Sequence, residues 1–101
     1  MSDQITLVVT ASPNPNEMEA VQDYVTKAGP LLAGAGGIPV KRLKITDVFF
    51  GDKSFAILLV MDFPSKQAVV DMFNSDAYQA LVPSRDKGFF QVNIFFAEAA
   101  G

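Results

Sequence analysis

Arg85 and two tyrosines, Tyr24 and Tyr78, are candidate ligand-binding side chains in this sequence. A guanidinium group is a permanent cation with a planar fork of N–H donors, so Arg85 could bind a carboxylate or an enolate oxygen. A phenol can donate a hydrogen bond to a ligand while its ring packs on the core. Plainer interpretations stay open, because Arg85 can pair with the adjacent Asp86 in a loop and each tyrosine can serve packing alone.

Asp62 and Asn93 are the polar residues least expected within their predicted strands, and both are further candidates for a ligand site. A buried carboxylate can act as a base, and an amide can position a carbonyl group or a water. On the predicted strand pairing, both side chains point away from the helices. The alternative is structural: Asp62 would accept hydrogen bonds from backbone N–H groups near Pro64, while Asn93 and Gln91 would form hydrogen bonds across a subunit interface.

The composition excludes several kinds of catalytic site, because the 101 residues include no Cys, His or Trp. They offer no Ser-His-Asp triad, no thiolate nucleophile, no zinc site made of thiolates and imidazoles, and no haem bound by a proximal histidine. Glu17, Glu19 and Asp23 lie close together on a predicted helix, but without converging partners they indicate a solvated face rather than a metal site. We expect no metal and no cofactor.

The charge distribution and the hydropathy pattern limit the partners. The net charge is -3, and the basic cluster of Lys41, Arg42 and Lys44 is too small to indicate nucleic-acid binding. The first residues lack a basic start followed by a long apolar run, so we expect no signal peptide, no membrane span and a cytoplasmic location. A chain of 101 residues is expected to form a single domain over residues 1–101.

Alternating strand and helix patterns must position these candidates. Residues 4–11 alternate and are rich in β-branched side chains, which predicts a strand that ends in the turn cluster at residues 12–15. Asn16 can then cap a helix with an apolar stripe, which the Gly29-Pro30 pair is expected to kink or divide. The glycine-rich run at residues 34–37 ends this helix and precedes a strand, which is the reverse of a phosphate-binding loop.

The remaining pattern predicts two antiparallel strands, a second helix, a short helical turn and a last strand. Their expected positions are residues 39–50 and 54–63 around a tight Gly51-Asp52 turn, a helix begun by Pro64-Ser65, a turn capped by Ser75 that ends before Pro83, and residues 89–96. The sum is β-α-β-β-α-β. This is the order of a ferredoxin-like α+β domain, with both helices on one face of a four-stranded antiparallel sheet.

Side-chain alternation assigns each strand residue to one of two sheet faces. One face points toward the helices and forms the core. The other face includes Lys44, but most of its side chains are apolar, and such a surface is not expected to stand in water across a whole sheet. We therefore expect a second copy to cover this face in a homodimer with face-to-face sheets. A monomer with an apolar open sheet is the alternative. The residues expected in the dimer interface are Val8, Val48, Leu58, Val60 and Phe95. The residues expected in the core, toward the helices, are Ile5, Leu7, Val9, Leu43, Ile45, Phe49, Phe55, Ile57, Leu59, Met61, Phe63, Phe90, Val92, Ile94 and Phe96.

Two stretches of the sequence resemble a known family. They are Tyr24-Val-Thr-Lys-Ala-Gly-Pro-Leu-Leu-Ala-Gly-Ala-Gly-Gly37, and the run from Phe63-Pro-Ser through Ser75-Asp-Ala-Tyr78 to Leu81 with the following Arg85. Together they resemble the domain of unknown function 1330 family, within the dimeric α+β barrel superfamily. The resemblance implies a homodimer whose two sheets form one barrel with the helices outside, and a small-molecule cleft between each sheet and its helices.

The family has no agreed activity, and the superfamily includes cofactor-free monooxygenases, isomerases, lactone-forming enzymes and haem enzymes. The resemblance therefore implies a fold rather than a function. This sequence departs from the enzymatic relatives because it has no His and no Trp, which puts haem chemistry and the quinone-forming oxygenase arrangement in doubt.

Two function classes remain. The favoured one is a small homodimeric binding or interaction module, because no strong nucleophile, metal site or cofactor motif is visible. The alternative is a cofactor-independent enzyme, of the monooxygenase or isomerase type, acting on a small aromatic or enolisable acid. In that enzyme Arg85 would hold the anion, and Tyr78 or Asp62 would move a proton. An enzyme of this kind needs Arg85 and Tyr78 to converge on a pocket, whereas an interaction protein would have these side chains turned to solvent or to each other.

Overall fold

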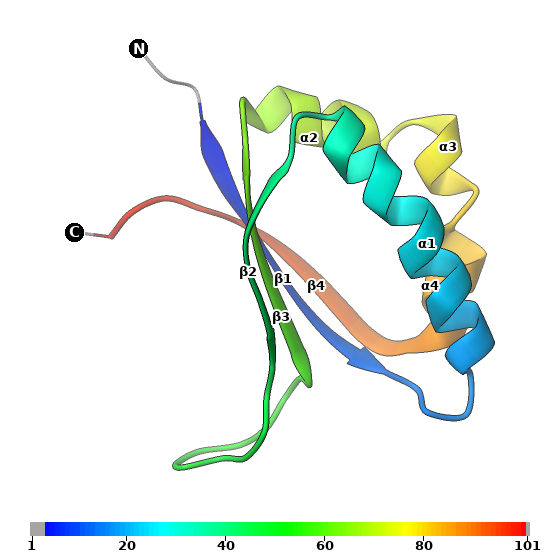
Figure 1. Ribbon diagram of the computed structural model, residues 1–101, viewed down its shortest axis with the longest axis vertical. Coiled ribbons are helices and arrows are strands. Elements are labelled where there is room, and N and C mark those ends of the chain that lie inside the picture. Colours follow the sequence, from blue (N-terminus) through cyan, green and yellow to red (C-terminus); the bar gives the residue numbers. More distant parts are fainter. Residues whose placement is uncertain (1–3, 101) are drawn as a thin grey trace.

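A four-stranded antiparallel sheet carries all the helices on one of its faces (Figure 1). The computed structural model describes residues 4–100. The strands lie in the order β2-β3-β1-β4, with bounds β1 (Ile5–Pro13), β2 (Ile38–Lys44), β3 (Ile57–Phe63) and β4 (Phe89–Ala97). The helices are α1 (Met18–Gly34), α2 (Lys66–Phe73), α3 (Asp76–Gln79) and α4 (Val82–Gly88). The predicted order of elements and the antiparallel sheet are confirmed.

The core lies between the sheet and the helices, where strand alternation brings apolar side chains to one face. Leu7 pairs with Met61 on β3, and both are buried with Phe63 and with Val69 of α2. A second buried cluster joins α1 to the later helices through Ala28, Met72, Tyr78 and Leu81. Because Tyr78 belongs to this second cluster, the core itself fixes the position of one candidate site residue.

Serine caps begin two of the helices as predicted. The Ser65 hydroxyl accepts a hydrogen bond from the Ala68 N–H at 3.1 Å, and the Ser75 hydroxyl accepts one from the Tyr78 N–H at 3.3 Å. The prediction that Asn16 caps the first helix is wrong. Instead, the Asn14 carboxamide oxygen accepts the Asn16 N–H at 2.9 Å in a tight local turn, and α1 begins two residues later at Met18.

Two prolines lie within helices of the structure. The first helix is not divided, since α1 continues through Pro30 to Gly34. The helical region does not end before Pro83, because Pro83 lies in the first turn of α4. A proline is tolerated there, since the first N–H groups of a helix have no partner within the helix. This extra helix carries Arg85, which the sequence had placed in a loop.

The β2–β3 hairpin is shorter than predicted. The two strands pair, but residues 45–56 leave the sheet as a long loop, with one further hydrogen bond from the Ile45 N–H to the Ala56 carbonyl at 2.8 Å. Gly51 lies at the tip of this loop with φ +98°, a conformation that favours glycine. Phe49 and Phe50 are 102% and 93% exposed, so the prediction that Phe49 belongs to the core is wrong.

Two bulges change the predicted sheet faces. The register of β2 against β3 shifts between Pro39 and Lys41, which brings Leu43 opposite Leu58 and Lys44 opposite Ile57. Leu43 therefore lies on the open face and Lys44 on the helix side, the reverse of the prediction, because one extra residue inverts all later side chains. The shift between Ser12 and Pro13 has the same effect at the start of β4, where Phe90 is 70% exposed rather than in the core. Among residues 4–100, no helix is both long and apolar enough to span a membrane.

Candidate functional site

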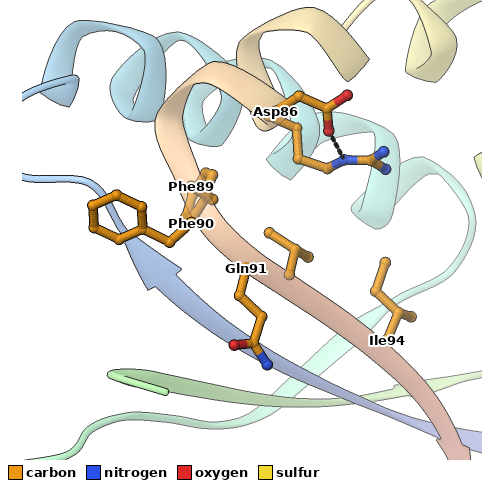
Figure 2. Close-up of a pocket in the computed structure, with 7 residues that line it drawn as sticks. Asp86, Phe89, Phe90, Gln91 and Ile94 are labelled. Atoms are coloured by element: carbon orange, nitrogen blue, oxygen red, sulfur yellow. Dashed lines mark hydrogen bonds and ion pairs between the residues drawn. The ribbon is translucent and has the colours of Figure 1, made fainter. Parts of the chain in front are cut away.

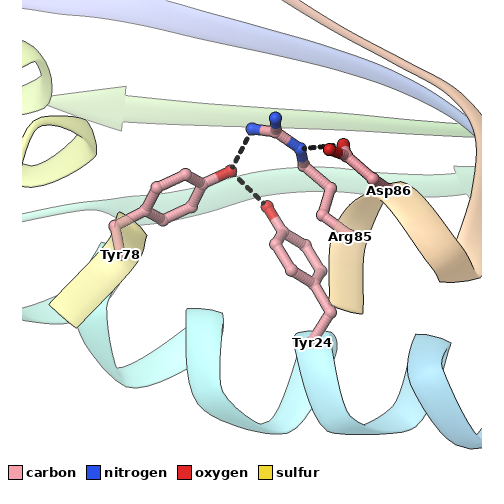
Figure 3. Close-up of polar contacts among 4 residues, drawn as sticks. All are labelled: Tyr24, Tyr78, Arg85 and Asp86. Carbon is pink, nitrogen blue, oxygen red and sulfur yellow. Dashed lines mark hydrogen bonds and ion pairs between the residues drawn. The ribbon is translucent and has the colours of Figure 1, made fainter. Parts of the chain in front are cut away.

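Tyr24, Tyr78 and Arg85 form one hydrogen-bonded chain that joins three helices (Figure 3). The Tyr24 and Tyr78 hydroxyl oxygens lie 2.8 Å apart, and Arg85 Nη1 donates to the Tyr78 hydroxyl at 3.2 Å. Arg85 Nε also donates to Asp86 Oδ1 at 3.4 Å. The structure therefore brings together three of the five predicted site residues, with Tyr78 at the centre of the chain.

The local sequence fixes the Tyr78 side chain in this position. Ser75 accepts the Tyr78 N–H and donates its own hydroxyl hydrogen to the Met72 carbonyl at 2.6 Å, so it holds the turn between α2 and α3. The Tyr78 ring then packs edge-to-face on Phe73, with ring centres 4.7 Å apart. It is 2% exposed, and only its hydroxyl takes part in the polar chain. Tyr78 is thus a rigid point to which the other polar groups attach.

The protonation states make this chain a hydrogen-bond donor rather than a base. Burial raises the pKa of Tyr24 well above its ordinary value, and the hydrogen bond to Tyr78 adds to this effect, so Tyr24 stays a neutral phenol. Burial disfavours the charge of Arg85, but hydrogen bonding to Tyr78 and the proximity of Asp86 outweigh it and raise the pKa of Arg85. Arg85 therefore remains a cation at every physiological pH.

The hydrogen-bonded chain of Tyr24, Tyr78 and Arg85 has more donor hydrogens than it has acceptors for them. The Tyr78 oxygen accepts from Arg85, and only one phenolic hydrogen is needed for the bond between the two hydroxyl oxygens, whichever tyrosine donates it. The other phenolic hydrogen has no acceptor among residues 4–100. The same holds for both hydrogens on Arg85 Nη2. These donors are suited to a molecule that carries acceptor oxygens.

Three hollows meet at this chain. The inner cavity, of about 330 Å³, lies between the sheet and α1 and is lined mainly by apolar side chains, with Tyr24 and Tyr78 in its wall. The edge groove, of about 360 Å³, includes Phe73, Tyr78, Arg85 and Phe96. The outer groove, of about 450 Å³, follows the start of β4 beside Arg85 (Figure 2). Ile94 lines all three, so the hollows adjoin at one point of the sheet edge.

Asp62 and Asn93 do not join the other three predicted site residues. Asp62 lies opposite Thr6, and its carboxylate accepts the Thr6 hydroxyl at 2.8 Å. Asn93 lies opposite Thr10 in the pairing of β1 with β4. Both residues belong to the sheet face that has no helices, whereas the tyrosines and Arg85 lie on the helix side. The two groups are therefore separated by the sheet itself.

The acidic face of α1 is balanced by neighbouring cations. Asp23 pairs with Lys27 at 2.7 Å, and Glu17 with Lys87 at 3.7 Å. Hydrogen bonds from Lys27 and then from Ser84 lower the pKa of Asp23. This arrangement agrees with the interpretation of these carboxylates as a solvated face.

Phe73 and Ile94 line the site but were not predicted as site residues. Phe73 packs against the buried core, as its place on the apolar side of the second helix predicts. Ile94 faces the helices as predicted, but it is 36% exposed and lines the hollows, so the prediction that it belongs to the core is wrong. Apolar periodicity shows that a side chain faces inward, but it does not show whether the space beside it is filled. No signal in the sequence indicated that a hollow remains next to these two residues.

The strand order, the one-sided helices and the hollows beneath them define a ferredoxin-like α+β domain with a candidate ligand site between sheet and helices. The chain belongs to the family described as a domain of unknown function, DUF1330, whose model matches residues 7–99. No functionally curated protein matches the chain.

Several solved structures share this fold. A protein of unknown function from Rhodopseudomonas palustris has a TM-score of 0.84 and 18% identity, covering 100% of this chain and 85% of its own. SnoaB, a cofactor-independent oxygenase from Streptomyces nogalater, has a TM-score of 0.68 and 11% identity, covering 99% of this chain and 96% of its own. A dimeric protein of unknown function with a ferredoxin-like fold from Bacteroides fragilis has a TM-score of 0.64 and 10% identity, covering 96% of this chain and 97% of its own. Identities this low show the fold alone.

Proposed function

We propose that this protein is a cytoplasmic homodimeric module that binds a small molecule with an apolar body in the hollows around Tyr78. The observation that carries the proposal is that the inner cavity and the edge groove share Phe73, Tyr78 and Ile94, beside donors that have no acceptor within residues 4–100. Small-molecule sites combine apolar walls with a few polar groups that fix orientation, in volumes of roughly 300–1,000 Å³. Both hollows, at about 330 and 360 Å³, fall in that range.

The open face of the sheet supports the homodimer. Val8 lies opposite Val60 on one neighbouring strand and opposite Phe95 on the other, and Phe95 is 53% exposed. Leu43 and Leu58 extend the same apolar surface across β2 and β3. A face of this chemistry is stabilised when it leaves water, by about 25 cal/mol per Å² of apolar area. A second copy related by a two-fold axis offers the same face in return.

The loop at residues 45–56 supports the same assembly. It projects from the β2–β3 end of the sheet (Figure 1), and it presents Val48, Phe49 and Phe50 to solvent. In a face-to-face dimer, each loop would extend along the second copy and bury these side chains. The similar protein from Bacteroides fragilis is described as dimeric, which agrees with this arrangement.

A native mass spectrum of protein purified without added ligand tests both parts. We expect a dimer that carries a discrete extra mass. The mass should disappear in Ile94→Trp, since the larger side chain at this position fills the inner cavity and the edge groove. Val92→Trp is the matched control, because Val92 lies on the same strand but lines only the outer groove. A monomer would contradict the assembly.

A dimer without extra mass calls for one more measurement, namely the melting temperature of the protein with a panel of small aromatic and aliphatic compounds. If none raises it, the binding function is contradicted. Cofactor-independent catalysis is the second candidate, because an anion held by Arg85 would lie beside Tyr78, and SnoaB is described as a cofactor-independent oxygenase. Oxygen uptake or proton exchange in a bound compound, lost in Arg85→Gln, would place catalysis first.

A further inference from the structure

We propose that the ligand of the edge groove carries a carboxylate, and that Asp86 occupies the place of this carboxylate on Arg85 until the ligand binds. The inference rests on the proposed binding function. It adds the chemical class of the ligand and an internal competitor for it.

Arg85 is only weakly engaged by its two partners. Charge-assisted N–H···O bonds are usually about 2.7–2.9 Å long, and strong carboxylate pairs use two parallel bonds. Here Asp86 makes one contact, at 3.4 Å to Nε, and its side chain is 67% exposed. Tyr78 takes the second position at 3.2 Å through Nη1. A ligand carboxylate can therefore replace Asp86 with little loss of interaction energy, and it can also accept hydrogen bonds from the unused N–H groups of the Arg85 guanidinium.

The edge groove continues from Arg85 into apolar walls. Val69, Phe73, Ile94 and Phe96 contribute to these walls, and Arg85 is the cation among the described residues that line the groove. A volume of about 360 Å³ corresponds to about a dozen water molecules at about 30 Å³ each. One cation at the end of an apolar groove fits a monocarboxylate with an aromatic or aliphatic body. A phosphate ester or a dicarboxylate would need further cations in the lining.

The site stays accessible in the proposed dimer. Arg85 lies on α4, and the helices cover the sheet face opposite to the one proposed for the second copy (Figure 1). The groove also lies at β4, which is an edge strand of the sheet. Each protomer therefore offers a complete edge groove that includes its own Arg85, with Asp86 beside it in the adjoining outer groove.

Phenylacetate and its neutral isostere phenylacetamide are the probes, titrated into the protein of 101 residues by calorimetry. We expect phenylacetate to bind at least about tenfold more tightly, as for a hydrogen bond to a charged group. Arg85→Gln should reduce the affinity for phenylacetate to that for phenylacetamide. Arg85→Lys keeps the charge but not the planar set of N–H donors, so its phenylacetate affinity should lie between those of the unchanged protein and Arg85→Gln. Lys87→Gln is the matched control, since it removes a cation from the same helix outside the edge groove.

Asp86→Asn tests the competitor. It should raise phenylacetate affinity about two- to fivefold, the equivalent of an exposed ion pair, and leave phenylacetamide affinity unchanged. Asp52→Asn, in the loop at residues 45–56, removes the same charge and should have no effect. The Nε–H nuclear magnetic resonance signal of Arg85 should move when phenylacetate binds, and in Asp86→Asn it should move less.

Three outcomes would overturn the inference. Equal affinity for phenylacetate and phenylacetamide would exclude a carboxylate as the recognised group. If that equal binding is lost in Ile94→Trp, the proposed binding function would still be supported. Unchanged or weaker phenylacetate binding in Asp86→Asn would exclude the competitor. If neither probe binds, the carboxylate class is excluded for this groove, and the proposed function is then decided by the retained mass and the melting temperatures alone.

Discussion

The Tyr78 hydroxyl is the atom on which the candidate site depends, and Tyr78→Phe removes it alone. The ring contacts stay, including the edge-to-face pair with Phe73, because phenylalanine keeps the ring. Two hydrogen bonds are lost, at 2.8 Å to Tyr24 and 3.2 Å to Arg85, in a side chain that is 2% exposed. Each hydrogen bond contributes about 0.5–1.5 kcal/mol net, so losing both costs about 1–3 kcal/mol. Each kcal/mol lowers the melting temperature of a domain of this size by roughly 4–8 °C.

Tyr24→Phe is the matched comparison, because it removes the same kind of atom from the other end of the bond. Tyr78 then keeps the hydrogen bond from Arg85, so we expect a smaller cost of about 0.5–1.5 kcal/mol. In the double variant, the Tyr24 hydroxyl that Tyr78→Phe leaves without a partner is also removed. Its cost should therefore stay within about 0.5 kcal/mol of that of Tyr78→Phe alone, rather than equal the sum.

Urea unfolding followed by circular dichroism, at one fixed protein concentration, measures these free energies of unfolding. The fixed concentration is needed because dissociation of a dimer contributes to the measured value. Additive costs, or a larger cost for Tyr24→Phe than for Tyr78→Phe, would refute the reasoning that Tyr78 joins the other two groups.

Three further predictions concern the assembly, a backbone position and an ion pair. Val60→Asp should convert the dimer to a monomer, measured by light scattering, because it places a charge at the centre of the open face; a dimer of unchanged affinity would exclude that face. Gly36→Ala should destabilise by about 1–3 kcal/mol, since Gly36 has φ +91° and a Cβ there would lie 2.8 Å from the Pro64 ring, whereas Gly34→Ala meets nothing within 4 Å and should be neutral or stabilising. The pKa of Asp23 is lowered in the folded protein, so its carboxylate stabilises the fold at pH values above its ordinary pKa of 3.8, and this stabilisation is lost as the pH falls through the folded pKa. In Asp23→Asn, the free energy of unfolding should therefore decline less with acid. An unchanged acid profile would contradict this.

The elements that were predicted correctly have strong local signals. Ser65 and Ser75 each precede a helix and cap it through the N–H three residues later, which depends on nearby residues alone. The alternation in β1 and β3 placed Leu7, Met61 and Phe63 in the core because no bulge interrupts these strands. Where the backbone is regular, the period of the sequence is sufficient to assign the faces.

The errors have physical causes that the sequence period does not contain. The bulge in β2 inverts Leu43 and Lys44, although the residues on both sides still look like a strand. Phe49 and Phe50 have high strand propensity, but no neighbouring strand is available to pair with them, so they leave the sheet. Strand propensity depends on such neighbours and is weak without them.

The candidate site was predicted in part, because chemistry and position come from different levels of the fold. Residue type alone was enough to select Arg85 and both tyrosines. Their convergence depends on α4, which the sequence pattern does not predict, because a proline after a helical stretch indicates its end as readily as the first turn of a new helix. Asp62 and Asn93 were selected by the same reasoning from residue type, and strand alternation places them on the other face.

The break of the second helical region into α2, α3 and α4 explains why a hollow exists beside β4. A single long helix would lie along the sheet and cover the edge strand. The turn at Ser75 and the new helix that starts at Val82 bend the chain around this edge instead, so Ile94 and Phe96 face the helices and still reach solvent. The same bends carry Tyr78 and Arg85 to the rim of the space that they leave open. The Ser75 cap and the start of α4 therefore also build the site, and a variant that joined α2 to α3 into one helix would close it.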